Sequence, residues 1–318
     1  MPGATCLLWY RRDLRLHDHP ALDHAVATFA RVVPVFVVDP EILSGRWPSP
    51  NRWWFLARAL KALRADIEKR GGRLVIVRGD PAVEIPRVAR EVGATDVVAS
   101  RDYTPFGRAR DERVQAALIA SGIEWSAGRG VLAHEPEEVL RDGGGAYHVF
   151  SPFHRRWLSL PLRSVLAAPA RIASGELPSP LLGDPDDLLG HPVPTADPDL
   201  LLQPSEIAAR ERLSRWSVSD ELRGYDTGRD RLDREGTSRL SQDLRWGLLS
   251  PVEVLARCEG PGPGPTRFRT EGARLSEGVE LGNGGRVRVA AGQRSVPTTL
   301  RDSQIADHLI LGVALDVR

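Results

Sequence analysis

Lysine is scarce in this sequence. Of the 43 basic residues among 318, only Lys61 and Lys69 are lysine, and the others are arginine. Together with 30 glycines and 25 prolines, this composition indicates a GC-rich genome rather than a binding signal. The formal net charge is +1, so no global positive field points to a nucleic-acid partner, and any contact with DNA requires a local patch.

Other absences argue against whole classes of protein. The two cysteines, Cys6 and Cys258, lack the spacing of a metal or redox motif and do not predict a disulfide framework. The first apolar stretch is too short for a signal peptide, because Arg11 and Arg12 end it, and no run of about 18 apolar residues predicts a membrane span. We therefore expect a cytoplasmic monomer of about two domains, since a domain has roughly 150 residues.

Short apolar runs alternate with amphipathic stretches over the first 130 residues. Residues 31–39 (RVVPVFVVD) are the clearest strand because they are rich in β-branched residues. Residues 51–70 are the clearest helix, with an apolar stripe that ends at two glycines. The alternation predicts an α/β fold: a Rossmann-like parallel five-stranded sheet with helices on both faces. Further strands are expected at residues 6–10, 73–77, 96–100 and 123–126, and further helices at residues 19–28, 80–92 and 107–120.

Ligands of such sheets bind beyond the carboxyl ends of the strands. The loops that deserve inspection therefore follow residues 10, 39, 79 and 100. No G-x-G-x-x-G or Walker sequence follows any of these strands, so a dinucleotide or P-loop site of the usual kind lacks its phosphate cradle.

The pattern changes after about residue 161. Proline, aspartate, leucine and glycine dominate residues 161–204, which predicts a long connector with little regular structure. Helical patterns resume at residues 205–216 and 237–246, and Ser250-Pro251-Val252-Glu253 is a capping box that begins another helix. Residues 270–318 contain no aromatic residue and only one clear apolar run, so we expect them to be poorly ordered.

Three long segments resemble the DNA photolyase and cryptochrome family. They are LLWYRRDLRLHDHPAL (residues 7–22), YHVFSPFHRRW (residues 147–157) and GYDTGRDRLDREGTSRLSQDLRWGLLSP (residues 224–251). The segments follow the family's order, and the resemblance covers roughly the first 270 residues. It implies a light-driven flavoprotein in which residues 205–271 begin an all-helical FAD-binding domain.

The third segment resembles the family's flavin-phosphate loop. On chemistry alone, hydroxyls at the start of a helix suit either simple capping or a diphosphate, and capping is the better-supported of the two. The resemblance favours the diphosphate, although Gln242 stands where the family usually has proline. It implies contacts to the FAD phosphates from Tyr225, Thr237, Ser238, Arg239, Leu240 and Ser241.

An antenna chromophore is often held by the family's α/β domain. Residues 101–111 (RDYTPFGRARD) follow an expected strand and resemble the deazaflavin-binding version, because the folate-binding version has an Asn–Glu pair where Phe106 and Gly107 stand. A deazaflavin is therefore expected rather than a folate. The candidate contacts are Arg52, Arg101, Asp102 and Arg245.

Two further clusters have simpler interpretations. The charged residues Arg11, Arg12, Asp13 and Arg15 are interpreted as an ion-paired interdomain face rather than a catalytic group. The histidines at positions 17, 19 and 24 are irregularly spaced and have no accompanying cluster of acidic residues or cysteines, so they do not predict a metal site.

The resemblance ends near Glu271. The family continues from a segment like residues 266–271 into an aromatic helix, whereas residues 272–318 are rich in Gly, Arg and Val. We hypothesise a frameshift or truncation from about Gly272, with impaired activity because most of the helical domain is missing or replaced. The expected division is an antenna-binding α/β domain (1–130), a connector (131–204), a partial FAD-binding domain (205–271) and an unrelated tail (272–318).

The function implied by the resemblance is that of a deoxyribodipyrimidine photo-lyase, which acts on damaged DNA. Its excited flavin donates an electron that splits a cyclobutane pyrimidine dimer flipped out of the duplex. Two alternatives remain: a cryptochrome-like photoreceptor, and a non-enzymatic α/β module that binds a chromophore. We expect no association with a membrane.

Overall fold

The computed structural model describes residues 3–44, 49–197, 201–231 and 233–280. The described chain divides into two compact units, which are considered separately. The first unit extends to Val131 and also includes Val165–Ala209 and Trp246–Leu249. The second comprises Leu132–Ser164, Arg210–Arg245 and the described residues from Ser250 onward.

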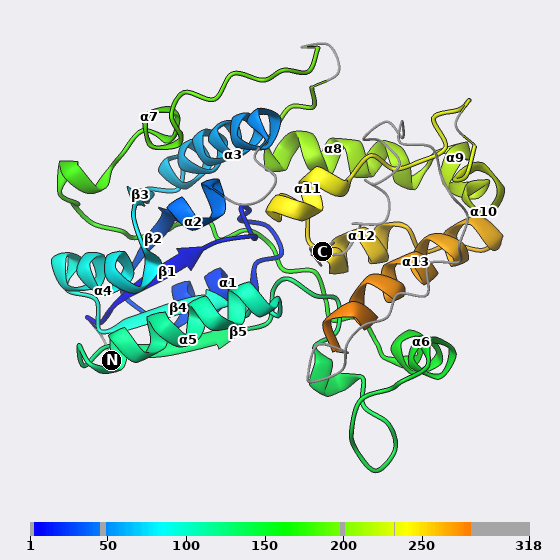
Figure 1. The fold of residues 1–318 in the computed structure, drawn as a ribbon, viewed down its shortest axis with the longest axis horizontal. Helices are drawn as coiled ribbons and strands as arrows, with labels where there is room; N and C mark the ends of the chain where they lie inside the picture. The colour runs from blue at the N-terminus through cyan, green and yellow to red at the C-terminus, as the bar shows by residue number, and fades with distance from the viewer. Residues whose placement is uncertain (1–2, 45–48, 198–200, 232, 281–318) are drawn as a thin grey trace. The chain divides into compact units, whose positions relative to one another are not determined.

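A parallel sheet in the order β3-β2-β1-β4-β5 forms the centre of the first unit (Figure 1). Each strand coincides closely with an expected one, so the predicted Rossmann-like sheet is confirmed. Its register pairs Trp9 with Val35 on one side and with Ala99 on the other. The strands are β1 (Thr5–Tyr10), β2 (Arg31–Val38), β3 (Val75–Arg78), β4 (Asp96–Ser100) and β5 (Glu124–Gly128).

Helices cover both faces of this sheet, as predicted. Alternate strand residues such as Leu7 and Val97 form a buried core with Ile85 of α4 and Val114 of α5. Strand residues of the opposite parity point to the other face. Right-handed crossovers place α1 and α3 on that face. The helices of this unit are α1 (Pro20–Thr28), α2 (Pro40–Leu43), α3 (Pro50–Glu68), α4 (Pro81–Val92) and α5 (Pro105–Ile119).

The strand order fixes where a ligand crevice is expected. The chain runs from β1 outward to β2 and β3, and then crosses to β4 on the other side of β1. The connections that leave β1 and β4 therefore run to opposite sides of the sheet. The gap between the carboxyl ends of these two strands is a topological switch point, which is the usual ligand position in open parallel sheets.

Much of the connector belongs to the first unit. Ser174 is buried, and its Oγ donates to the Val32 carbonyl oxygen over 2.9 Å. Leu182 forms an isolated parallel bridge to Ile76 of β3. Apart from η2 (Ser179–Leu181) and α7 (Pro185–Leu189), residues 161–197 have little regular structure, as expected.

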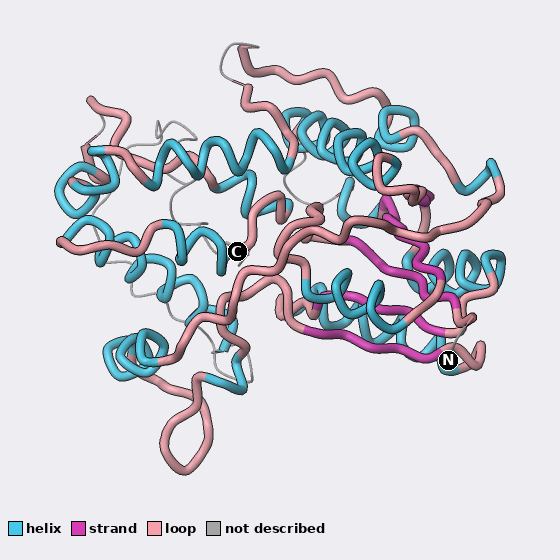
Figure 2. Tube along the Cα trace, turned by 180° about the vertical axis from the view of Figure 1, so that it is seen from behind, coloured by secondary structure: helices cyan, strands magenta, loops and turns pink. Residues whose placement is uncertain are grey.

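The second unit is built from helices (Figure 2). One prediction about it is wrong: the helix expected from Thr237 begins at Ser241. Arg239 has a φ of 53°, in the left-handed region, so residues 237–240 cannot continue a helical turn. The elements are η1 (Pro136–Glu138), α6 (Phe150–Ser159), α8 (Glu206–Ser217, whose first four residues lie in the first unit), α9 (Asp220–Arg223), α10 (Tyr225–Gly228), α11 (Ser241–Trp246), α12 (Pro251–Arg257) and α13 (Pro263–Glu280).

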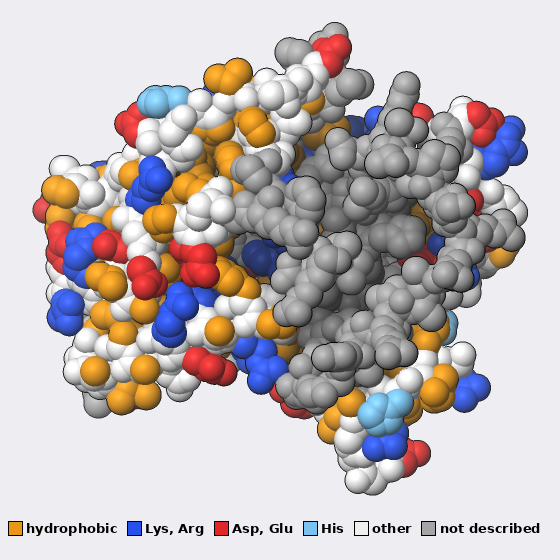
Figure 3. Space-filling view, in the orientation of Figure 1, with side chains coloured by type: hydrophobic (Ala, Val, Ile, Leu, Met, Phe, Trp, Pro, Cys, Tyr) orange, Lys and Arg blue, Asp and Glu red, His pale blue; other side chains and the backbone are white. Residues whose placement is uncertain are grey.

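Helix α13 extends nine residues beyond Glu271, where the resemblance ends. Residues 281–318, the rest of the tail, lie outside the described residues. Over the described part of the first unit, acidic and basic side chains are interspersed on the face in Figure 3, in keeping with the small net charge. None of the helices in the described ranges combines the length and apolarity needed to cross a bilayer.

Candidate functional site

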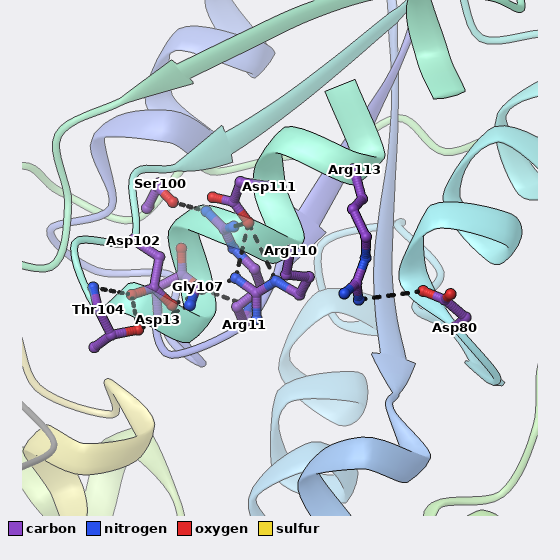
Figure 4. Close-up of polar contacts among 10 residues, drawn as sticks. All are labelled: Arg11, Asp13, Asp80, Ser100, Asp102, Thr104, Gly107, Arg110, Asp111 and Arg113. Carbon is purple, nitrogen blue, oxygen red and sulfur yellow. Dashed lines mark hydrogen bonds and ion pairs between the residues drawn. The ribbon is translucent and has the colours of Figure 1, made fainter. Parts of the chain in front are cut away.

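A buried ion-pair network lies at the carboxyl ends of β1 and β4 (Figure 4). We call Arg11, Asp102, Arg110 and Asp111 the sheet-edge cluster. Asp111 Oδ1 accepts hydrogen bonds from Arg11 Nη1 over 2.5 Å and from Arg110 Nη2 over 2.9 Å. Arg11 also donates to the Ser100 carbonyl oxygen, which joins the ends of the two strands. The cluster therefore occupies the switch point.

Trp9, the penultimate residue of β1, has two guanidinium groups close to its ring. The Cζ atoms of Arg11 and Arg110 are 4.6 and 5.0 Å from the centroid of the Trp9 ring. Such contacts stabilise a buried guanidinium by about 1–2 kcal/mol. The carboxylates of Asp102 and Asp111 balance the charge of the two guanidiniums, and the Trp9 ring supplies an apolar surface beside them.

Asp102 is held by a tight turn that precedes α5. Its Oδ1 accepts from the Thr104 backbone N–H over 3.0 Å and from the Thr104 hydroxyl over 2.9 Å, and its Oδ2 faces Arg110 Nη2 at 3.3 Å. A Cβ atom at Gly107 would lie only 2.1 Å from Asp102 Cγ. Glycine at position 107 is therefore what allows this placement of Asp102.

The electrostatics keep Asp102 ionised. Burial raises its pKa, but the neighbouring guanidiniums, that of Arg12 first, outweigh burial and hold the pKa below its ordinary value. The cluster thus presents a carboxylate as a hydrogen-bond acceptor.

Asp39 directly follows β2 at the same edge of the sheet. Its Oδ1 caps α2 by accepting from the Glu41 backbone N–H, whereas its buried Oδ2 has no hydrogen-bond partner among the described residues. Burial raises the pKa of Asp39. A buried polar atom without a partner needs an explanation, and a bound water, ion or ligand would satisfy it.

The predicted antenna residues are only partly brought together. Asp102 belongs to the cluster, and Arg101 lies beside it, with its Cζ 5.6 Å from the Tyr103 ring centroid. Arg52 is exposed on the first turn of α3. Arg245 lies in the second unit, so its predicted role across the interface stays a prediction.

Sequence reasoning missed Arg110, Asp111 and Asp39 as members of this edge. A signal was available for Asp39, because it ends one of the strands whose loops deserve inspection. Arg110 could have been noticed because it lies in the segment 101–111 that sequence analysis singles out, on the helix that follows Asp102. Asp111 ends the same segment, but only the folded structure brings Arg11 beside it.

Asp13, another member of the N-terminal charge cluster, pairs with a residue close to it in sequence. Asp13 Oδ2 lies 3.1 Å from His19 Nε2, and burial, which raises the Asp13 pKa, is outweighed by His19, so the pKa is lowered. His19 also caps α1, because its Nδ1 accepts from the Leu22 backbone N–H over 3.1 Å. Asp13 and His19 thus stabilise the loop between β1 and α1, which is a structural role rather than a catalytic one.

The second candidate site, here called the phosphate segment, comprises residues 237–241 of the second unit. Ser238, Leu240 and Ser241 are buried, Thr237 is half-buried, and Arg239 is exposed and paired with Glu235. The segment therefore combines three hydroxyl groups and a guanidinium within five residues. This donor set fits a diphosphate chemically.

Tyr225 is packed within an aromatic cluster. Its ring centroid lies 5.9 Å from that of Trp216 and 5.3 Å from that of Phe268, both in edge-to-face geometry. Tyr225 is only 1% exposed. Its ring thus contributes to the core of this unit, and only its hydroxyl could serve a ligand.

Comparison with known proteins identifies the family of this chain. A family model described as DNA photolyase matches residues 6–171, more than half of the chain. The chain belongs to the DNA photolyase family.

Individual relatives agree with this assignment. The deoxyribodipyrimidine photo-lyase of Streptomyces griseus is 34% identical over 81% of this chain and 56% of its own length. Cryptochrome-1 of Arabidopsis thaliana is 29% identical over 79% of this chain and 37% of its own length. The crystal structure of a class III photolyase from Agrobacterium tumefaciens has a TM-score of 0.78 and 28% identity, over 88% of this chain and 59% of that one. The chain thus spans about half the length of the photolyase relatives it matches.

Proposed function

We propose that this chain is deoxyribodipyrimidine photo-lyase-like and binds FAD through the phosphate segment. The observation that carries the proposal is the donor set of residues 237–241, together with membership of a family of light-driven flavoproteins. Thr237, Ser238 and Ser241 would donate from their hydroxyls, Arg239 from its guanidinium, Leu240 from its backbone and Tyr225 from its hydroxyl. Bound flavin would supply light absorption and the electron that splits a cyclobutane pyrimidine dimer in damaged DNA.

The residues of this chain would bind and orient the cofactor. Buried Ser238 and Ser241 have few alternative conformations, so little side-chain entropy is lost when an anion binds them. Arg239 would have to exchange Glu235 for a phosphate, a modest cost because that pair is solvent-exposed. In this proposal, residues 205–271 belong to a helical FAD-binding domain and residues 1–130 to an antenna domain.

We further propose that the sheet-edge cluster binds an antenna chromophore, which we expect to be a deazaflavin rather than a folate. Arg101 and Asp102 lie at that edge, and Arg52 and Arg245 are the more distant candidates. Orphaned Asp39 Oδ2 supports a ligand there. A longer side chain at position 107, such as the glutamate of the folate-binding version, would displace Asp102 as it is placed here.

The visible spectrum after gentle purification tests both proposals at once. Bound oxidised flavin that is released intact as FAD supports the first, and an additional deazaflavin band supports the second. Replacing Ser238 and Ser241 by alanine should lower the flavin content, whereas replacing Ser159 and Ser217, in the same unit but outside the segment, should not. A flavin content insensitive to the first pair would contradict the proposed phosphate site.

Light-dependent repair separates the enzyme from its alternatives. A dimer-containing oligonucleotide is incubated with the flavin-loaded chain in light and in darkness. Repair in light alone supports the lyase, whereas bound flavin without repair favours the photoreceptor. A chromophore without any flavin favours the α/β module.

A further inference from the structure

Two side chains of helix α8 contact residues in or next to the proposed flavin-phosphate site. Arg212 and Trp216 are four residues apart, so they lie on one face of the helix. Trp216 contacts Tyr225, and Arg212 contacts Asp243 in α11, two residues beyond Ser241. All of these residues belong to the second unit.

The contact between Arg212 and Asp243 is a two-pronged ion pair. Nε of Arg212 donates to Oδ2 of Asp243 over 3.0 Å, and Nη2 donates to Oδ1 over 2.5 Å. The Asp243 side chain is fully buried, and that of Arg212 is only 10% exposed. This planar, bidentate geometry fixes orientation as well as distance, which lysine cannot reproduce.

Asp243 lies in the first turn of α11, two residues after the end of the phosphate segment. Leu240 and Leu244 are buried on either side of it, so the backbone between them has little freedom to move. A displacement of Asp243 would therefore be transmitted to Ser241. Ser238 is coupled to the same stretch, because its Oγ accepts from the Leu240 backbone N–H over 3.5 Å.

Stability alone gives a weak reason for such a pair. A buried ion pair often contributes no more to folding than two well-packed apolar residues of similar volume. What it contributes is a single defined arrangement, which matters where polar groups must meet a ligand in one geometry.

We propose that Arg212 is a positioning residue of the phosphate segment, acting through Asp243. The ion pair holds Ser238 and Ser241 in the orientation in which their hydroxyls meet a diphosphate, while Trp216 holds Tyr225 from the same helix face. The inference rests on the proposed FAD site and adds a residue that would not itself touch the cofactor.

The chain offers a matched control on the same helix. Arg210 also pairs with a buried carboxylate, its Nε lying 3.0 Å from Oε1 of Glu253 in α12. That pair is similar in chemistry but fastens α8 to a different helix. Arg210→Lys therefore measures the general effect of replacing an arginine of α8 that pairs with a buried carboxylate.

The experiment compares FAD and riboflavin binding by the full chain and its variants. Arg212→Lys should weaken FAD binding about tenfold, the equivalent of one charge-assisted hydrogen bond. Riboflavin, which has no phosphate, should bind Arg212→Lys and the wild type alike, and Arg210→Lys should change neither affinity by more than about twofold. In a Ser238→Ala/Ser241→Ala background, Arg212→Lys should have little further effect on FAD.

Hydrogen exchange provides a readout that requires no flavin. Amides of residues 238–244 should exchange faster in Arg212→Lys than in Arg210→Lys, and Asp243→Asn provides a second variant should the first fail to fold. Equal exchange in both lysine variants, or equal losses of FAD affinity, would overturn the inference. A wild-type chain that binds no FAD but shows the expected exchange difference would instead count against the proposed cofactor site alone.

Discussion

Arg15 donates from Nη1 to the carbonyl oxygen of Gly247 over 3.1 Å, across 232 positions of sequence. Its Nη2 donates to the carbonyl oxygens of Asp18 and Gly130 over 2.9 and 2.8 Å. Beside it, the Leu14 backbone N–H donates to the Trp246 carbonyl oxygen over 3.0 Å. A fully buried guanidinium is thus surrounded by backbone carbonyls, and this explains why residues 246–249 belong to the first unit.

Gly247→Ala should destabilise the protein by roughly 2–4 kcal/mol. Gly247 has a φ of 69°, and an added Cβ would lie 2.0 Å from the Arg12 carbonyl oxygen. Gly93 is a matched control, because it has the same φ but no heavy atom within 4 Å of an added Cβ. Gly93→Ala should cost only about 1–2 kcal/mol in urea unfolding. Equal losses at the two positions would show that the close approach to Arg12 does not matter.

Gly107→Ala should destabilise the first unit by about 1–3 kcal/mol, because the new Cβ displaces Asp102 from Arg110 and Thr104. The effect should depend on Asp102. In an Asp102→Ala background the clash is absent, and alanine is favoured over glycine in a helix by about 1 kcal/mol. Gly107→Ala should then be neutral or stabilising in urea unfolding, and identical losses in both backgrounds would contradict this account.

Asp243 should make stability depend on pH. Burial raises its pKa from 3.8 to about 6, although Arg212 lowers it. The folded state therefore binds this proton more tightly than the unfolded chain does between pH 4 and pH 6. It follows that the free energy of unfolding contributed by this group falls as the pH rises through that range, by about 3 kcal/mol in total.

The measurement compares unfolding of the wild type and Asp243→Asn from pH 4 to pH 7. The stability of the wild type relative to Asp243→Asn should decrease as the pH rises. Asp220→Asn, at an exposed position, should show no comparable trend. A relative stability that increases with pH would mean that Arg212 holds the Asp243 pKa below its ordinary value.

The order and type of the elements were largely determined by local sequence. Residues 31–39 contain five valines, and β2 forms almost where expected, because a strand buried on both faces of a parallel sheet is rich in such β-branched residues. The local sequence pattern did not predict the start of a helix correctly where the backbone conformation depends on packing. Thr237 looked like a helix start, but the left-handed conformation of Arg239 delays α11 to Ser241.

Family membership was likewise determined by sequence, because it depends on long ordered segments that can be read directly. The partners of buried charges were decided only by tertiary structure. No spacing rule links Arg11 to Asp111, or Arg212 to Asp243, because these pairs form only when separate elements meet. A buried charge must find its counter-charge wherever the fold provides one, and the sequence shows the charges but not their distances.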